Sequence, residues 1–588
     1  MQLVKKKKFW LILLVCLVVL AAVVYGVFRL VTNSLMESEI RDRDSWEIQT
    51  GSYAFTDEEL QIDLYTDPVE ASITVLQMVP HEYQSEGFTY YDESVQQRLA
   101  QSLATMLEIR EHTLAEPLAV LNPFGTGSNG LYLCFTTEAR CQIRYTVHVD
   151  DADIPDYTAT ANNNGEGGYS RVHEFLLIGL VPGETNTVTL EAVGTQGRVR
   201  DSFSFTIDMP ETTSGYANRL ETTDGESAAA LSDGLFYAMG LGDYYGYTFF
   251  FDNDGVMRYE MVMDGYHADR ILNLDGDIVT CVGSTKLARL SRLGQAVRVY
   301  DLGQYELHHD INWGPDGTVL ALATDTESET VEDQLIQIDL ETGAVTKLVD
   351  FSQLLYDYFA TTEAVSATDS FFWQAGEWDW LHLNSVQYLE EDDSILVSSR
   401  ETSTILKVSQ VTTSPTLTWM AGDSDFWADT PYADYCLEQV GDFIPQYGQH
   451  DVELVEDDTL EEGQYLLRFY NNNYWSNSTR EDGYSPDLPD SVGTGLYAEG
   501  EQYSYVYFYL IDENAGTFTL VDSFSVPYSS VVSNAQDTGE TYVVNSGVNQ
   551  TFGEYDADGA LIRSYQYECL MNGYRVMKSD FVGFWFQS

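Results

Sequence analysis

Short turns that end in glycine recur through the second part of this sequence, each between two alternating strand-like segments. The turns are Asp254-Gly255, Leu293-Gly294, Asp316-Gly317, Thr342-Gly343, Ala515-Gly516 and Asp558-Gly559. A dipeptide of this kind between alternating segments is typical of a β-hairpin. Because the hairpins repeat along one stretch of chain, they indicate the blades of a β-propeller rather than unrelated hairpins.

The repeats divide into six units, so we predict an all-β fold with a six-bladed propeller over residues 213–588. The units begin near Gly234, Asp264, His308, His382, His450 and Ser529. The strand that closes the ring is expected from residues 573–585 or from the start of the domain. A propeller has a central pocket on its axis, which is where we expect ligands to bind.

A smaller β-domain is predicted before the propeller. Short alternating strands separated by turns over residues 116–212 favour a β-sandwich of the fibronectin or immunoglobulin type. Residues 32–115 are expected to form a polar stalk followed by a partly helical region. Within that region, apolar residues at helical spacing predict one amphipathic helix over residues 93–113.

The N-terminus carries a membrane signal. Four lysines lie in residues 1–8, and an uncharged apolar run follows that is long enough to cross a bilayer as a helix. We predict a transmembrane signal anchor over residues 9–31, a cytoplasmic basic tail over 1–8, and an extracytoplasmic propeller on a single-pass cell-membrane protein. A cleaved signal peptide is the alternative. The net charge of −64 opposes binding to nucleic acid.

Histidines stand before strand-like segments in three successive repeats, at His309, His382 and His450. When the repeats are aligned from these residues, each reads as a histidine, an alternating strand, an acidic turn and a second strand. Equivalent positions of neighbouring blades converge on the axis, so the three imidazoles should face one pocket. Arg400 ends the second strand of the His382 hairpin and should return to His382, because antiparallel strands reverse direction.

Three imidazoles and one guanidinium form a site suited to a tetrahedral oxyanion, such as a sulfate or phosphate ester. A zinc site is an alternative for three histidines, but a neighbouring arginine opposes a metal cation, so we expect no metal. The other alternative is that each histidine is a structural hydrogen-bonding residue.

Four segments resemble the signatures of the bacterial aryl-sulfate sulfotransferases, the PAPS-independent arylsulfotransferase family. They are residues 308–317 (His-His-Asp-Ile, then Pro-Asp-Gly), 379–386 (Asp-Trp-Leu-His-Leu-Asn-Ser-Val), 392–400 (Asp-Asp-Ser-Ile-Leu-Val-Ser-Ser-Arg) and 448–450 (Gly-Gln-His). The resemblance extends roughly from residue 118 to the C-terminus. It implies a small β-domain before a six-bladed propeller, and transfer of a sulfuryl group from a phenolic sulfate ester to a phenol through a sulfohistidine.

The resemblance also implies roles for single residues. His450 would be the nucleophile, and the groups that hold the sulfate oxygens would be His309, His382, Arg400 and Asn384. Whether His308 or His309 enters the site stays open. No cofactor is implied, and the partners would be a small phenolic sulfate donor and a phenol acceptor. The assembly also stays open, with a homodimer among the alternatives.

Two other functions compete with this interpretation. The first is a propeller that binds sulfated or phenolic ligands without turnover. The second is a hydrolase in which water is the acceptor. Hydrolases of that type generally use a metal and a modified cysteine or serine, and the sequence shows no matching motif.

Overall fold

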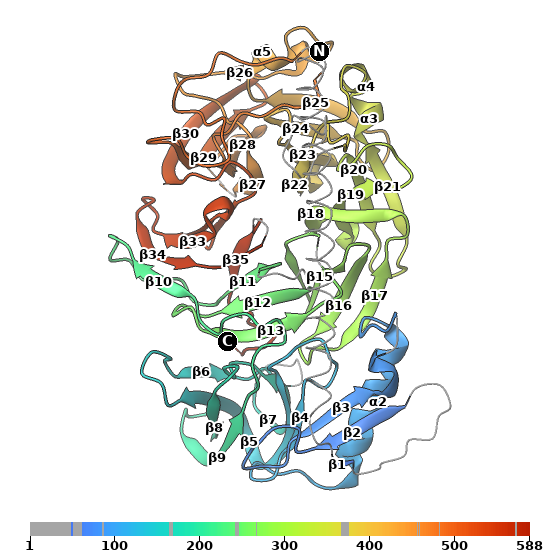
Figure 1. Ribbon diagram of the computed structural model, residues 1–588, viewed down its shortest axis with the longest axis vertical. Helices are drawn as coiled ribbons and strands as arrows, with labels where there is room; N and C mark the ends of the chain where they lie inside the picture. Colours follow the sequence, from blue (N-terminus) through green and yellow to red (C-terminus); the bar gives the residue numbers. More distant parts are fainter. Residues whose placement is uncertain are drawn as a thin grey trace, which may run out of the picture.

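The computed structural model has two parts, a ring of β-sheets and a smaller β-domain at one end of it (Figure 1). The structure describes residues 49–50 and 61–587, except 85–86, 164–167, 242–245, 266, 366–375, 456, 458, 481–482 and 571–572. The predicted basic tail, the transmembrane segment and most of the stalk lie outside the described residues. Within the described part of the chain, no helix is long and apolar enough to cross a membrane.

Nine strands form the smaller domain, in one continuous sheet. They are β1 Gln49–Thr50, β2 Ile62–Thr66, β3 Leu76–Pro80, β4 Leu118–Leu121, β5 Leu131–Val149, β6 Tyr157–Thr160, β7 Ser170–Leu177, β8 Thr185–Val193 and β9 Val199–Asp208. The first half of β5 pairs with β4 and β7, and the second half pairs with β6 and β8. Side chains of both halves share one buried core, so β5 joins two parts of an immunoglobulin-like domain.

The sheet of this domain begins earlier in the chain than the predicted domain. β3 pairs in parallel with β4 and antiparallel with β2, so residues 62–80 extend the sheet instead of forming the end of a stalk or part of a helical region. The physical reason is that β4 would otherwise be an open sheet edge with unpaired backbone groups.

The predicted helix forms as α2, Glu93–Ile109, and ends four residues earlier than expected. The Asp92 carboxylate caps it by accepting hydrogen bonds from the backbone of Ser94 and Val95. Its apolar face buries Leu99 and Leu103 in a core shared with the propeller. Helix α2 therefore helps to hold the two parts together.

Six sheets form the propeller, as predicted. Blade 1 contains β35 Val576–Ser579, β11 Leu235–Met239, β12 Tyr247–Phe251 and β13 Met257–Val262; blade 2 contains β14 Ile271–Leu274, β15 Asp277–Gly283, β16 Lys286–Ser291 and β17 Ala296–Asp301; blade 3 contains β18 Tyr305–Trp313, β19 Val319–Asp325, β20 Gln334–Ile338 and β21 Val345–Asp350. Blade 4 contains β22 Leu383–Leu389, β23 Ser394–Ser399, β24 Thr404–Ser409 and β25 Thr416–Ala421; blade 5 contains β27 His450–Val455, β28 Gln464–Asn471, β29 Tyr503–Asp512, β30 Thr517–Pro527 and β26 Glu438–Gln439; blade 6 contains β31 Asn534–Asp537, β32 Tyr542–Ser546, β33 Thr551–Tyr555, β34 Leu561–Gln566 and β10 Glu221–Asp224.

Short helical segments connect these strands. They are α3 Phe351–Leu354, α4 Tyr356–Phe359, α5 Ser424–Trp427, η1 His81–Gln84, η2 Pro315–Gly317, η3 Glu390–Asp392, η4 Ala433–Tyr435 and η5 Gly547–Asn549. All six glycines that end the predicted turns lie between paired strands and have positive φ, from 68° at Gly516 to 86° at Gly294. The hairpin prediction is thereby confirmed, since glycine adopts this backbone conformation without a Cβ clash.

Both predicted sources contribute to closing the ring. The C-terminal β35 pairs with β11 and forms the inner strand of blade 1. At the other end of the domain, β10 pairs with β34 as the outer strand of blade 6. The C-terminal strand therefore completes the first blade, and the N-terminal strand of the propeller completes the last blade. This exchange leaves few open sheet edges.

Candidate active site

The three histidines predicted to converge do lie together. The ring centroids of His309 and His382 are 4.7 Å apart, and those of His309 and His450 are 6.4 Å apart. The distance between the rings of His382 and His450 is 6.3 Å. Because His309 is in β18, His382 directly precedes β22 and His450 begins β27, the cluster joins the inner strands of blades 3, 4 and 5.

Irregular backbone at these strands directs the side chains. The pairing register shifts next to each histidine, between Leu307 and Ile311, between Leu383 and Ser385, and between His450 and Glu453. His309 and His382 have positive φ values of 55° and 51°. Bulges and left-handed residues of this kind often re-aim side chains at functional sites.

Hydrogen bonds between neighbouring inner strands correct the predicted alignment of the repeats. In each bond, a side chain on one inner strand accepts from a backbone N–H of the next. The pairs are Asp310 Oδ2 with Val386 N, Ser385 Oγ with Val452 N, Asp451 Oδ2 with Ala535 N, and Asn534 Oδ1 with Val576 N, at 2.9–3.0 Å. Since Asp310, Ser385 and Asp451 are equivalent, the residues before them are equivalent too. Asn384, and not His382, therefore corresponds to His309 and His450.

His450 is fully buried, and its surroundings fix its tautomer. Its Nδ1 lies 2.9 Å from the Gly448 carbonyl oxygen and 2.8 Å from Asn472 Oδ1. Because the amide nitrogen of Asn472 donates to Ser529 O, Oδ1 is the acceptor, and Nδ1 of His450 carries the proton. Burial, followed by the nearby His382, lowers the pKa of His450 well below its usual value. His450 is therefore neutral, with a lone pair on Nε2.

His382 is surrounded by carboxylates, in contrast to His450. Its Nδ1 lies 2.6 Å from Asp379 Oδ2 and 2.8 Å from Glu332 Oε2. Burial and the charge of Arg400 act to lower the pKa of His382, but the two carboxylates outweigh them and raise it to about 9. His382 is therefore an imidazolium at neutral pH, beside the neutral ring of His450.

Arg400 returns to His382, as the hairpin predicted. Its backbone N–H donates to the His382 carbonyl oxygen at 3.1 Å. The guanidinium is buried, with Nη2 3.1 Å from Glu401 Oε2 and 3.6 Å from Asp379 Oδ2. Glu401 is itself held by the backbone N–H of Ser478. The carboxylates thus fix the plane of a second cation in the cluster.

His309, and not His308, contacts the other two histidines. The Nδ1 atoms of His308 and His309 are 3.0 Å apart, so His308 reaches the cluster through its neighbour. Burial lowers the pKa of both, of His308 to about 4 and of His309 well below its usual value. Asn384 is also buried at the centre, where its amide nitrogen donates to the Gln449 carbonyl oxygen at 2.9 Å.

Comparison with known families identifies this combination of domains. Residues 221–572 match the arylsulfotransferase (ASST) family, and residues 118–210 match the arylsulfotransferase Ig-like domain. The chain belongs to the arylsulfotransferase family. Its members are sulfuryl-transferring enzymes, so the prediction of the family and of the enzyme class is confirmed.

Other comparisons add less. No curated protein matches this arylsulfotransferase. Solved structures that resemble it include a putative 6-phosphogluconolactonase from Bacteroides fragilis, with 12% identity over 75% of this chain and 98% of that one and a TM-score of 0.33. Another is the WD40 domain of Toxoplasma gondii coronin, with 8% identity over 59% of this chain and 76% of that one and a TM-score of 0.27. Similarity at this level does not bear on function.

The structure adds four residues to the predicted site of this arylsulfotransferase: Glu332, Asp379, Asn472 and Tyr574. Asp379 stands three residues before His382, within a motif that the sequence displays, so its pairing could have been predicted. Asn472 lies at the end of a strand hairpin opposite His450. Glu332 and Tyr574 lie outside the aligned motifs, and no sequence signal marks them.

Tyr574 packs between the histidines and the charged residues near them. Its ring centroid is 5.1 Å from that of His309 and 5.6 Å from that of His450. Its hydroxyl donates to the Asn384 carbonyl oxygen, and the guanidinium of Arg575 lies 4.3 Å from its ring. The tyrosine therefore separates the histidine cluster from a buried ion-pair network.

This network joins the inner strands near the axis. Arg575 Nη1 lies 2.9 Å from Asp310 Oδ1, and its Nε lies 2.8 Å from Asp451 Oδ1. Arg270 Nε is 2.9 Å from Asp310, and its Nη2 is 2.6 Å from Glu453. These contacts link blades 2, 3 and 5 to the residue that precedes β35, so the network fixes the blades that carry the histidines.

A metal ion is the other occupant that these histidines suggest. Ligand atoms of His309, His382 and His450 lie within 4.8 Å of one another. However, two carboxylates hold a proton on His382, and Arg400 adds a second positive charge. A protonated imidazole has no lone pair on nitrogen for a metal, so the arrangement suits an anion better than a cation.

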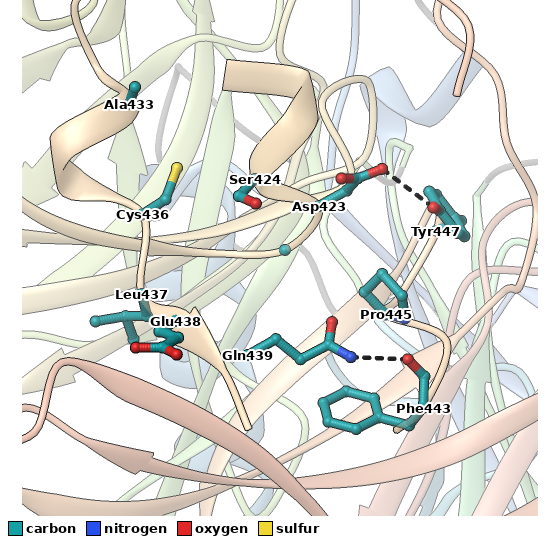
Figure 2. A pocket seen from close by; sticks show the side chains of 11 residues that line it. Asp423, Ser424, Ala433, Cys436, Leu437, Glu438, Gln439, Phe443, Pro445 and Tyr447 are labelled. Carbon is teal, nitrogen blue, oxygen red and sulfur yellow. Dashed lines mark hydrogen bonds between the residues drawn. The ribbon is translucent and has the colours of Figure 1, made fainter. Parts of the chain in front are cut away.

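A separate cavity of about 640 Å³ lies beside the segment that leads to His450 (Figure 2). Its lining includes Asp423, Cys436, Glu438 and Tyr447, and the Tyr447 hydroxyl donates to Asp423 at 3.2 Å. Burial raises the pKa of the Cys436 thiol to about 11, so the thiol is protonated. Among the described lining residues there is no Lys, Arg or His, and the cavity is therefore unsuited to an anionic ester.

Proposed function

We propose that this arylsulfotransferase moves a sulfuryl group from a phenolic sulfate ester to a phenol, by a ping-pong mechanism through a sulfohistidine and without PAPS. The observation that carries the proposal is the tautomer of His450. Its Nδ1–H is committed to Gly448 and Asn472, so Nε2 keeps its lone pair at neutral pH. A buried neutral imidazole beside two cations is a competent nucleophile toward an anionic ester.

In the first half-reaction, the lone pair of His450 Nε2 forms a bond to the sulfur of the ester. The bond between sulfur and the phenolic oxygen breaks, and its electron pair leaves on that oxygen. The imidazolium of His382 gives its proton to the phenolate, and the phenol departs. His450 then carries the sulfuryl group, and His382 is neutral.

The second half-reaction reverses these steps with another phenol. Neutral His382 takes the proton from the acceptor hydroxyl while the phenol oxygen forms a bond to sulfur. The bond between Nε2 and sulfur breaks, and its electron pair returns to His450. One site thus serves donor and acceptor in turn, with no nucleotide.

The remaining residues would stabilise the transferring group. Arg400 and His309 are placed to donate hydrogen bonds to the sulfuryl oxygens, where charge is held in the transition state. Asn384 contributes a second amide hydrogen beyond the one that holds Gln449. His308 supports His309 through their Nδ1 contact and would act on the substrate only indirectly.

We also propose that the enzyme works outside the membrane, on an anchor formed by residues 9–31. The support is the apolar run after four lysines, in a chain whose net charge of −64 is otherwise unusually acidic. Protease treatment of intact and of opened cells expressing the full-length chain tests this. Digestion of the propeller in intact cells supports the proposal, and protection there contradicts it.

The transfer itself is tested with the full-length chain in detergent, using 4-nitrophenyl sulfate with and without added phenol. We expect nitrophenol release that requires phenol, needs no nucleotide and is absent in His450→Ala. The matched control is His148→Ala, an exposed histidine of the smaller domain that pairs with Asp156. Release without phenol would favour a hydrolase. Binding of the ester without any release would favour the alternative, a propeller that binds but does not catalyse.

A further inference from the structure

Glu332 lies in the connection between β19 and β20 of blade 3, held in an unusual backbone conformation. Its φ is 56°, in the left-handed region that residues with a Cβ rarely adopt. Its backbone N–H donates to Thr324 Oγ1 at 2.9 Å, and its carbonyl oxygen accepts from the Leu383 N–H of blade 4 at 3.3 Å. The two blades that carry His309 and His382 therefore both fix this residue.

The Glu332 carboxylate lies near the Nδ1 atoms of three histidines. Its Oε2 lies 2.8 Å from His382 Nδ1, 3.7 Å from His309 Nδ1 and 4.0 Å from His308 Nδ1. An imidazole whose Nδ1 faces a carboxylate is oriented by it, with Nε2 on the opposite side of the ring. The two longer contacts exceed hydrogen-bond distance, so His382 is the ring that this carboxylate orients.

One other carboxylate makes the same contact with His382. Asp379 also faces His382 Nδ1, but it is shared with Arg400, which lies 3.6 Å away. Glu401 is paired with Arg400 at 3.1 Å. Among the described residues, other titratable groups whose charges act on the cluster include His267 before blade 2, Glu377 before blade 4 and His450 from blade 5.

We propose that Glu332 is a positioning residue that keeps the proton on His382 and orients its ring, so that His382 presents Nε2–H to the reacting sulfuryl group. This inference rests on the proposed function. It assigns to a residue outside the recognised motifs the control of the proton that passes to the departing phenolate and returns from the acceptor phenol.

The proposal predicts a defined dependence on pH. The pKa of His382 is raised to about 9, so His382 is protonated below that pH and loses its proton as the pH rises through it. Formation of the sulfohistidine should therefore fall above about pH 9. Glu332→Gln removes one negative charge that faces Nδ1, and the fall should move to lower pH by about one unit or more, the usual effect of an opposite charge at this distance.

The experiment compares full-length wild type, Glu332→Gln, Glu332→Asp and Glu329→Gln. Glu329→Gln is the matched control, because it makes the same chemical change on an exposed side chain three residues away. The kinetic measurement is kcat/KM for 4-nitrophenyl sulfate against pH, read after quenching in alkali. We expect the alkaline limb to shift in Glu332→Gln, to recover at least in part in Glu332→Asp, and to stay unchanged in Glu329→Gln.

A second measurement does not depend on sulfuryl transfer. The imidazole resonance of His382, assigned by its loss in His382→Gln, is titrated by NMR in each variant. A lower pKa of His382 in Glu332→Gln supports the proposal. If no variant transfers sulfuryl groups, that result still supports the role of Glu332, and the proposed function alone fails. An unchanged pKa of His382 in folded Glu332→Gln overturns it, as does an equal loss of rate at every pH.

Discussion

At neutral pH the imidazoles of His450 and His382 differ in charge because their Nδ1 atoms face different partners. A carbonyl and an amide oxygen leave His450 neutral, whereas two carboxylates keep His382 protonated. Surroundings that push the pKa values of two groups apart give the groups different roles in catalysis. Two histidines in one cluster can therefore act as nucleophile and as acid.

Arg400 offers a prediction at the scale of one residue. Its planar guanidinium can hold two sulfuryl oxygens at once, which the ammonium of lysine cannot reproduce. We expect Arg400→Lys to lower kcat/KM for an aryl sulfate by about 10- to 100-fold, the loss of one charge-assisted hydrogen bond. Arg198→Lys, at an exposed position of the smaller domain, is the control and should keep full activity. Wild-type kinetics for Arg400→Lys would exclude a bidentate role.

The inner strands explain which parts of the site could be predicted from sequence. Hairpin turns and alternating segments depend on local chemistry, so the six blades and the return of Arg400 to His382 followed from the sequence. The offset of His382 from the shared position depends on a bulge in β22, which has no sequence signature. Glu332 reaches the site from a connection in blade 3, and only the tertiary structure brings such a residue to the axis.

The buried ion-pair network that joins the inner strands also gives a prediction about stability. Arg575 neutralises Asp310 and Asp451, both of which are buried. Removing one partner of a buried ion pair leaves an uncompensated charge and costs about 3–5 kcal/mol. We expect Arg575→Met to lower the midpoint of thermal unfolding strongly. In Arg563→Met, which breaks pairs with the exposed Asp224 and Asp254, the cost should be at most about 1 kcal/mol. Equal midpoints for the two variants would contradict a closing role for the network.

At the scale of the whole molecule, the acidic charge and the cationic site act in opposite directions on an anionic donor. The net charge of −64 repels a sulfate ester at long range, while His382 and Arg400 attract it only at contact. The immunoglobulin-like domain packs against blades 1 and 2, away from blades 3 to 5 that carry the histidines (Figure 1).

Salt should therefore speed the capture of the donor. Because counterions screen the long-range repulsion, we expect kcat/KM for 4-nitrophenyl sulfate to rise with ionic strength between low and physiological salt. The matched measurement uses the neutral acceptor, and kcat/KM for phenol should stay constant over the same range. A fall in kcat/KM for the donor would show that local cations, and not the net charge, govern its approach.

The central claim is that His450 carries the sulfuryl group between donor and acceptor, and trapping that intermediate tests it most directly. The full-length chain is incubated with 4-nitrophenyl sulfate without a phenol, and its intact mass and peptide masses are measured before and after phenol is added. The account predicts a gain of one sulfuryl group on the peptide that contains His450, its loss on addition of phenol, and no gain in His450→Ala. Sulfuryl transfer that continues in His450→Ala, or a label on another residue, would contradict it.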